Sequence, residues 1–278
     1  IQNTRRAATR LYYIRRNSMH PFEDLDVPEG SVGIHWFGQS TLGLKDPKGT
    51  IVQVDPYYPR ERPSDRFVHA RPPLNEESLR TDYVILTHDH GDHTCIESIE
   101  RIVGTYPDVR FVGPEESIKH IRASNIDNDS VTVTAGDTTE LCTMTAHTIY
   151  AKPPAGLPDD GIDPPDVNHL GYVVEAGGVR IYISGDPVNT FGNHEELLAP
   201  IRELKPDIGF LTNHPKEGEF PFFDGSAKIA SALSLKTASP THYSCFVSRD
   251  YDPQEWAAGL QGVEPLIIPY NQSVVYSN

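Results

Sequence analysis

Short apolar runs separated by turn residues dominate the first part of the chain. Residues 31–37, 41–44 and 50–54 are apolar or β-branched, and glycine, proline and aspartate interrupt them. Short runs of this composition between turn-forming residues are typical of β-strands. The pattern therefore predicts a β-meander that begins near residue 31.

Farther along the chain, predicted strands alternate with segments of helical periodicity. Residues 83–86 form a short apolar run, after which Ile96, Ile99, Ile102 and Val103 recur at helical spacing. Further strands are predicted near 111, 131–134, 141–145, 170–174, 179–183, 208–211, 266–268 and 274–276, and helices over 115–123, 195–204, 226–235 and 253–260. This order indicates two halves with strands followed by helices, and hence an α/β fold with a sandwich of two sheets and helices outside.

The length of 278 residues fits one large domain, which we expect over residues 31–278, preceded by an arm over 1–30. The first 16 residues carry five arginines and no acid. We expect a structural arm that packs on a neighbouring subunit of a homo-oligomer. The tail of a targeting peptide, a docking arm for an acidic partner and a solvated helix are the alternatives. Two long loops, 56–75 with four arginines and 151–168 rich in proline, glycine and aspartate, interrupt the domain.

The net charge excludes one class of partner. With 24 Lys and Arg against 39 Asp and Glu, the chain has a formal net charge of −15. Because binding to phosphates needs clustered Lys and Arg, this charge argues against a broad nucleic-acid-binding face. It has no apolar run of about 18 residues that would span a membrane, and no secretory signal pattern, so we expect a cytoplasmic protein. The three cysteines do not suggest a disulfide framework and are expected to be small buried hydrophobes.

The chemistry is concentrated between the strand at 83–86 and the helix that follows. Three histidines and two aspartates fall within six residues, in the order His88, Asp89, His90, Gly91, Asp92, His93. Neutral imidazole and carboxylate together suit Zn, Mn or Fe, and a buried cluster of such groups is costly without a partner. The alternate residues His88 and His90 can face one metal, while Asp92 and His93 can turn toward a second.

Three later residues complete a candidate ligand set. His147 and Asp186 follow predicted strands, His242 lies in the run Ser239-Pro240-Thr241-His242-Tyr243, and Gly185 suits a tight approach of the backbone. Each residue alone is weak evidence for a metal site, but the ordered set after the first cluster is specific. Asp89 is the local candidate for a carboxylate that accepts from the second ring nitrogen of a ligand histidine, and anchoring of the loop through backbone N–H groups is the equal alternative.

These residues resemble the metallo-β-lactamase superfamily over residues 31–278. The resemblance implies an αββα sandwich of two mixed β-sheets flanked by helices, with one or two metals at its rim. It assigns the first metal to His88, His90 and His147, the second to Asp92, His93 and His242, and a bridging role to Asp186.

A narrower resemblance is to the ascorbate-6-phosphate lactonase group. It is carried by Trp36-Phe37-Gly38, Leu157 to Gly161, Val167-Asn168, Ser184-Gly185-Asp186 and Asp252 to Glu255. The loop at 56–80 differs from those lactonases. Gln39 stands where many hydrolase relatives carry histidine after the Trp-x-Gly turn.

The expected activity is that of a metallo-hydrolase. Two metals about 3.5–4 Å apart would share a water, lower its pKa toward about 7 and present hydroxide to a carbonyl. Asp92 and His242 are the expected catalytic residues, and Asp92 would orient the water and relay a proton to the leaving alkoxide.

We expect a lactone or similar ester of a small polar metabolite, which can carry a phosphate, as the substrate. Phosphodiesterase activity and a non-catalytic metal-binding role are the alternatives. The candidate substrate contacts are Asn168, His169, His214, Tyr243 and Arg249, with the arginines of the first loop as a further source of anion contacts.

Overall fold

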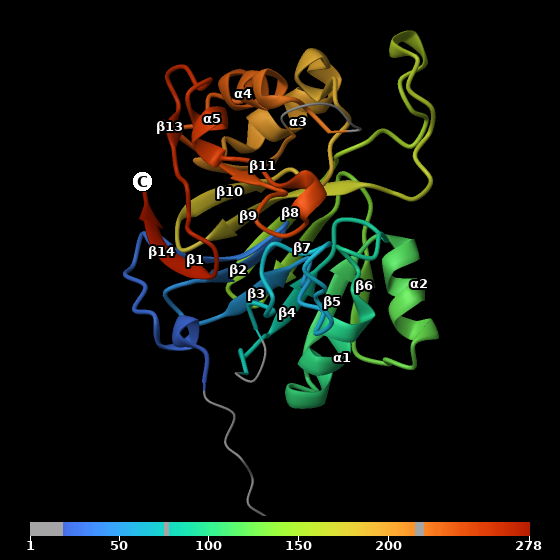
Figure 1. Cartoon of the computed structure of the whole chain (residues 1–278), viewed down its shortest axis with the longest axis vertical. Helices are drawn as coiled ribbons and strands as arrows, with labels where there is room; N and C mark the ends of the chain where they lie inside the picture. The colour runs from blue at the N-terminus through green and yellow to red at the C-terminus, as the bar shows by residue number, and fades with distance from the viewer. Residues whose placement is uncertain (1–18, 75–77, 215–219) are drawn as a thin grey trace, which may run out of the picture.

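Two seven-stranded β-sheets pack face to face in the computed structural model, and helices cover the outer face of each (Figure 1). The structure describes residues 19–74, 78–214 and 220–278. Most of the arginine-rich arm lies outside this range, and its expected contact with a second subunit stays a prediction. Within the described residues, no helix is long and apolar enough to cross a membrane.

The first sheet combines an antiparallel meander with a parallel half. The pairs β14–β1, β1–β2 and β2–β3 are antiparallel, and β3 to β6 pair in parallel. In spatial order its strands are β14 (Gln272–Ser277), β1 (Ser31–Gly38), β2 (Thr41–Lys45), β3 (Ile51–Val54), β4 (Tyr83–Ile85), β5 (Arg110–Gly113) and β6 (Ser130–Thr132). Helices α1 (Ile96–Thr105) and α2 (Glu115–Ala123) cover its outer face (Figure 1).

The second sheet is built in the same mixed way. Strands β7 to β10 pair antiparallel, and β10 to β13 pair in parallel. In spatial order its strands are β13 (Glu264–Pro265), β12 (Thr237–Thr241), β11 (Ile208–Thr212), β10 (Val179–Ile183), β9 (Leu170–Ala176), β8 (Met144–Tyr150) and β7 (Thr138–Leu141). Its outer face carries α3 (Glu195–Leu204), α4 (Phe223–Ala232) and α5 (Pro253–Ala257).

In the described part of the chain, four single-turn 3₁₀ helices lie in the connections. They are η1 (Pro21–Asp24), η2 (Pro158–Asp160), η3 (Phe191–Asn193) and η4 (Val247–Arg249).

Buried apolar side chains fill the space between the sheets and the space under the helices. Trp36, Leu42, Val174 and Ile181 belong to the core between the two sheets. Separate cores lie under α1 and α2 and under α3 to α5. This four-layer arrangement confirms the predicted α/β sandwich of two mixed sheets flanked by helices.

Part of the expected arm belongs to the packed domain. Phe22 is fully buried in the core of the first sheet with Phe37, and its ring lies against Gly43. The side chain of His20 is also buried. The chain therefore joins the core before the first strand at Ser31.

The predicted strand at 141–145 is wrong, because the chain turns there. Leu141 ends β7, Met144 begins β8, and Cys142 between them has a left-handed backbone with φ 62°. Cys142 is consequently exposed at a hairpin turn rather than buried. The strand expected at 266–268 is likewise absent, because pairing in the second sheet ends with Glu264–Pro265.

Candidate metal centre

The candidate ligands lie at one edge of the sandwich, where strands of both sheets end. Strand β4 leads into residues 88–93, β10 leads toward Asp186, and β12 ends directly before His242. Because β9 runs antiparallel to β10, the residue that precedes β9, His169, lies at the same edge. The topology thus brings together residues that are far apart in the sequence.

Backbone contacts fix the two sheets to each other at this edge. The Leu170 N–H donates to the carbonyl of Thr87 at 2.9 Å, and the Tyr172 hydroxyl donates to the carbonyl of Leu86 at 2.8 Å. Gly185 has φ +58°, and a Cβ added there would lie 2.2 Å from the Leu170 carbonyl oxygen. The predicted tight approach at Gly185 is confirmed, and only glycine fits this position.

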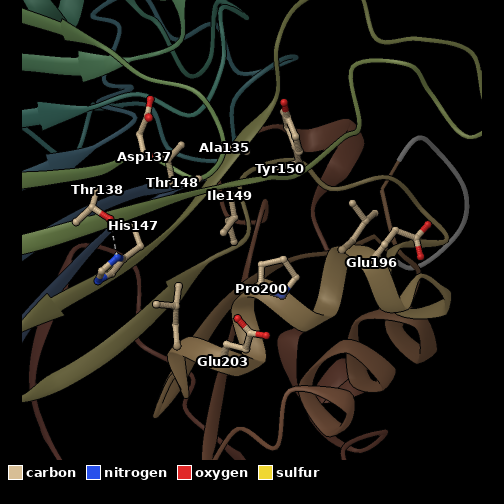
Figure 2. Close-up of a pocket in the computed structure, with 13 residues that line it drawn as sticks. Ala135, Asp137, Thr138, His147, Thr148, Ile149, Tyr150, Glu196, Pro200 and Glu203 are labelled. Atoms are coloured by element: carbon tan, nitrogen blue, oxygen red, sulfur yellow. Dashed lines mark hydrogen bonds between the residues drawn. The ribbon is translucent and has the colours of Figure 1, made fainter.

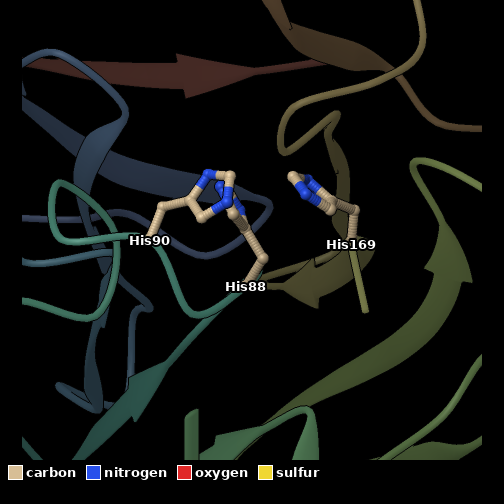
Figure 3. A group of neighbouring side chains, drawn as sticks. All are labelled: His88, His90 and His169. Carbon is tan, nitrogen blue, oxygen red and sulfur yellow. The ribbon is translucent and has the colours of Figure 1, made fainter. Parts of the chain in front are cut away.

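Three imidazoles form the first ligand group. One ring nitrogen from each of His88, His90 and His169 lies within 4.8 Å of the others. The ring centroid of His88 is 4.6 Å from that of His90 and 4.1 Å from that of His169. Figure 3 shows the three rings turned toward one another. His169, which we expected to contact substrate, therefore takes the place expected for His147.

The structure does not bring His147 to this edge. It is paired with Val173 in the middle of the β8–β9 ladder, whereas the pair nearest the ligands is Tyr150 with Leu170. Three residues of extended chain, about 10 Å, separate His147 from that end. Its Nδ1 lies 3.1 Å from the Thr138 hydroxyl, in a pocket between β8 and α3 (Figure 2). The cause is the hairpin turn, which starts β8 at Met144 and places His147 within the strand.

A second ligand group surrounds Asp186. The ligand atoms of Asp92, His93 and His242 lie within 4.8 Å of one another, as do those of His88, His93 and Asp186. Asp186 Oδ2 is 3.4 Å from His93 Nε2 and 3.6 Å from His88 Nε2, and its Oδ1 is 2.9 Å from His242 Nε2. Asp186 thus lies between the two groups, as the bridging assignment expects.

These residues fit a bound metal, because buried ligand atoms of His88, His93, His169, Asp186 and His242 have no hydrogen-bond partner. The buried atoms without a partner include His88 Nε2, His93 Nε2, His242 Nε2, Asp186 Oδ1 and both ring nitrogens of His169. A buried polar atom without a partner is costly, so a cluster of them indicates a missing ligand. Two ligand atoms about 2.0–2.1 Å from one tetrahedral zinc would be roughly 3.3 Å apart, which is close to the separations around Asp186.

The electrostatics of the cluster also suit a cation. Burial lowers the pKa of His88 well below its usual value, and it lowers the pKa of His169 to about 3. Both imidazoles are therefore neutral, which metal ligation requires. Burial alone would raise the pKa of Asp186, but the His242 and His93 rings hold it well below its usual range. Burial opposes the charging of His93, yet Asp186 and two further carboxylates raise its pKa well above the usual value.

Asp55 supports the centre from behind, and sequence reasoning did not identify it. Its buried carboxylate accepts from the Thr87 N–H at 2.8 Å and from the Thr87 hydroxyl at 2.6 Å, and lies 2.8 Å from His93 Nδ1. A carboxylate in this position orients the imidazole and leaves Nε2 free for a metal. The supporting role expected for Asp89 is wrong, because Asp89 pairs with His120 on α2. The feature of the sequence that could have identified Asp55 is its place as an acidic residue directly after β3.

Gln39 contacts both sides of the second ligand group. Its side chain is buried, and its Nε2 donates to Asp92 Oδ2 at 2.9 Å and lies 3.4 Å from His242 Nδ1. The Gln39 backbone has φ 53° and is tied to the last ligand loop, since its carbonyl accepts from the His242 N–H at 3.1 Å. Its Oε1 is buried without a partner.

A pocket of about 480 Å³ lies over the centre. Asp92, Asp186 and His90 belong to its lining, together with Arg66 and Arg249 from two loops. Of the expected substrate contacts, Arg249 is therefore placed at the pocket.

Three other expected substrate contacts are engaged in the protein. Asn168 donates to Glu116 on α2 at 2.9 Å. Tyr243 is buried and stacks on Trp36 with ring centroids 4.4 Å apart. His214 pairs through its backbone with the segment that leads into α4.

Comparison with known proteins agrees with this fold. The model of the family described as "Beta-lactamase superfamily domain" matches residues 51–243. The chain is 25% identical over 248 residues to a UPF0173 metal-dependent hydrolase of Ruegeria sp. (strain TM1040), a match that covers 84% of this chain and 96% of the relative.

Two solved structures share the architecture at low identity. A metallo hydrolase of Ignicoccus hospitalis has a TM-score of 0.67 at 17% identity, covering 89% of this chain and 99% of the other. An isothiocyanate hydrolase from Delia radicum gut bacteria has a TM-score of 0.67 at 18% identity, and the match covers 88% of this chain and 99% of that protein. The narrower resemblance to the lactonase group stays a prediction. Because the family model matches more than half of the chain, the chain belongs to the metallo-β-lactamase superfamily.

Proposed function

We propose that the chain is a metal-dependent hydrolase that opens a lactone or similar ester of a small polar metabolite. The observation that carries the proposal is the group of buried imidazole and carboxylate atoms without partners at the base of a pocket of about 480 Å³. The 25% identical relative, which is named a metal-dependent hydrolase, supports the same class.

The residues divide into two sets that would hold metal. His88, His90 and His169 would form one set, Asp92, His93 and His242 the other, with Asp186 between them. When bound, divalent ions there supply Lewis acidity and a water that ionises near neutral pH. Zn, Mn and Fe all accept these ligands.

Asp92 is the carboxylate placed to exchange a proton with substrate. Its side chain is 24% exposed, whereas that of Asp186 is 3% exposed, although both contribute to the pocket lining. The hydrogen bond from Gln39 fixes one oxygen of Asp92 and leaves the other oxygen for the reacting groups. We assign to Asp92 the transfer of a proton to the leaving alkoxide, and to His242, whose Nε2 lies 2.9 Å from Asp186 Oδ1, the holding of metal beside Asp186.

Cysteine side chains are poor alternatives as nucleophiles here. Cys95 and Cys245 are buried in an aromatic cluster with Tyr57 and Phe67. Burial raises the pKa of the Cys245 thiol to about 11, so little thiolate is present at neutral pH. Activation of water rather than a covalent intermediate therefore suits this site.

The test is a substrate panel on protein of known metal content. We expect the Zn- or Mn-loaded protein to open lactones faster than it cleaves bis(p-nitrophenyl) phosphate. Asp186→Ala is expected to lose bound metal and activity together. Faster phosphodiester cleavage would favour the phosphodiesterase alternative, and no turnover of any lactone or ester by the metal-loaded protein would refute the proposal.

A further inference from the structure

Two arginines that form no ion pair with any described residue lie at the pocket over the metal centre. Arg66 comes from the loop after β3 and Arg249 from η4, and both contribute to the lining that includes Asp92 and Asp186. Both residues are exposed, and neither guanidinium forms an ion pair with any residue in the described part of the chain. Among the described residues, therefore, no carboxylate pairs with either of these two charges.

Aromatic rings hold both guanidinium groups in place. The Arg66 guanidinium carbon is 5.4 Å from the ring centroid of Phe67 and 5.6 Å from that of Phe246, and that of Arg249 is 5.3 Å from that of Phe220. Contact with an aromatic face stabilises the cation without using its N–H donors. Those donors remain available for an oxyanion, which guanidinium binds in a forked geometry.

Backbone hydrogen bonds make the two arginine-bearing loops one wall of the pocket. The Val68 N–H donates to the Cys245 carbonyl at 2.9 Å, and the Val247 N–H donates to the Arg66 carbonyl at 3.0 Å. Phe67 also pairs with Phe246 in an antiparallel bridge. The last ligand, His242, lies a few residues before this wall, so the position of the arginines is coupled to that of the centre.

We propose that Arg66 and Arg249 form an anion-binding subsite, which takes a carboxylate or phosphate group of the substrate while its ester bond faces the metal centre. This inference rests on the proposed function and names its substrate class, namely small esters or lactones that carry an anionic group. Asp92 and Asp186, the carboxylates that contribute to the pocket lining, would hold metal, whose charge would offset theirs, so they would not compete for the arginines.

Matched esters that differ only in charge test the subsite. Mono-4-nitrophenyl glutarate and 4-nitrophenyl pentanoate have the same chain length, and the ratio of their kcat/KM values measures recognition of the carboxylate. In Arg66→Gln and Arg249→Gln we expect this ratio to fall about tenfold to a hundredfold, since each removes a hydrogen-bonded charge pair. Arg71→Gln removes the same charge from the same loop outside the pocket lining and should keep the wild-type ratio.

A binding experiment separates failure of the subsite from failure of the proposed function. Calorimetric titration of the zinc-loaded protein with glucose 6-phosphate, and with glucose as the neutral control, measures phosphate binding without turnover. Weaker glucose 6-phosphate binding in the two pocket variants than in Arg71→Gln supports the subsite even if no ester is hydrolysed. An unchanged ester ratio together with unchanged phosphate binding in both pocket variants would overturn it, whatever the activity of the wild type.

Discussion

Replacing Gln39 by methionine tests how the second ligand group is held. The Gln39 amide donates to Asp92 Oδ2 at 2.9 Å, and methionine has a similar volume but no donor. We expect the affinity for metal at Asp92, His93 and His242 to fall. The set formed by His88, His90 and His169 does not take part in this hydrogen bond. Its affinity for metal should therefore be the same in the variant as in wild type.

The magnitude follows from the exposure of Asp92. A hydrogen bond to a charged group contributes about 1.5–3 kcal/mol when it is fully buried. Because the Asp92 side chain is 24% exposed, water can replace part of the lost bond, which favours the lower end of that range. The expected loss is about tenfold in metal affinity, within the range of about 10–100-fold for groups that support metal ligands. Folding stability should change little, because the variant also removes the buried Gln39 Oε1 that has no partner.

The assay is zinc titration of metal-free protein in competition with a chromophoric chelator, followed by urea unfolding of the same samples. Gln53→Met is the matched control, because Gln53 is also buried and hydrogen-bonded, to Thr81 at 2.6 Å and Tyr58 at 2.9 Å, without contacting a ligand. Gln53→Met should lose stability and keep zinc affinity. Equal zinc affinity in Gln39→Met and wild type, or an equal loss in both variants, would refute the reasoning.

Three further predictions concern single histidines and one aspartate. His169→Ala should lose metal by elemental analysis while His147→Ala retains it; the opposite result would restore His147 as the ligand. Asp55→Asn should weaken metal binding about 10–100-fold in the same chelator assay, because the carboxylate orients His93, and wild-type affinity would contradict this role. Burial lowers the pKa of His35 in the folded protein to about 4, whereas the unfolded chain keeps the usual value of 6.5. Well above pH 6.5 the ring is neutral in the folded and the unfolded protein. As the pH falls below 6.5, the unfolded chain takes up the proton first. The contribution of His35 to the free energy of unfolding should therefore fall by about 3 kcal/mol between pH 6.5 and pH 4, and urea titrations should show a smaller loss of stability over this range in His35→Gln than in wild type.

The sequence by itself determined the architecture and the ligand cluster at residues 88–93 of the metal centre. Alternating apolar runs and helical spacing are local properties of the chain, so most elements could be placed within a few residues. The cluster at residues 88–93 could be recognised because its members share one loop between β4 and α1. Asp186 could be recognised because it follows a strand whose apolar pattern is clear, β10. The strand before His242, β12, is largely polar, so His242 could be recognised only as the last member of the ordered ligand set.

Only the tertiary structure decided which histidine completes the first group and what supports the second. The choice between His147 and His169 depends on a hairpin turn at Cys142 and on the pairing of Tyr150 with Leu170, and neither leaves a clear mark in hydrophobicity. A shift of a few residues in a strand moves a side chain along the sheet by about 3.3 Å per residue. Asp55 and Gln39 act through contacts across 38 and 53 residues of sequence. Such contacts exist only once the two sheets have packed, which is why local pattern could not reveal them.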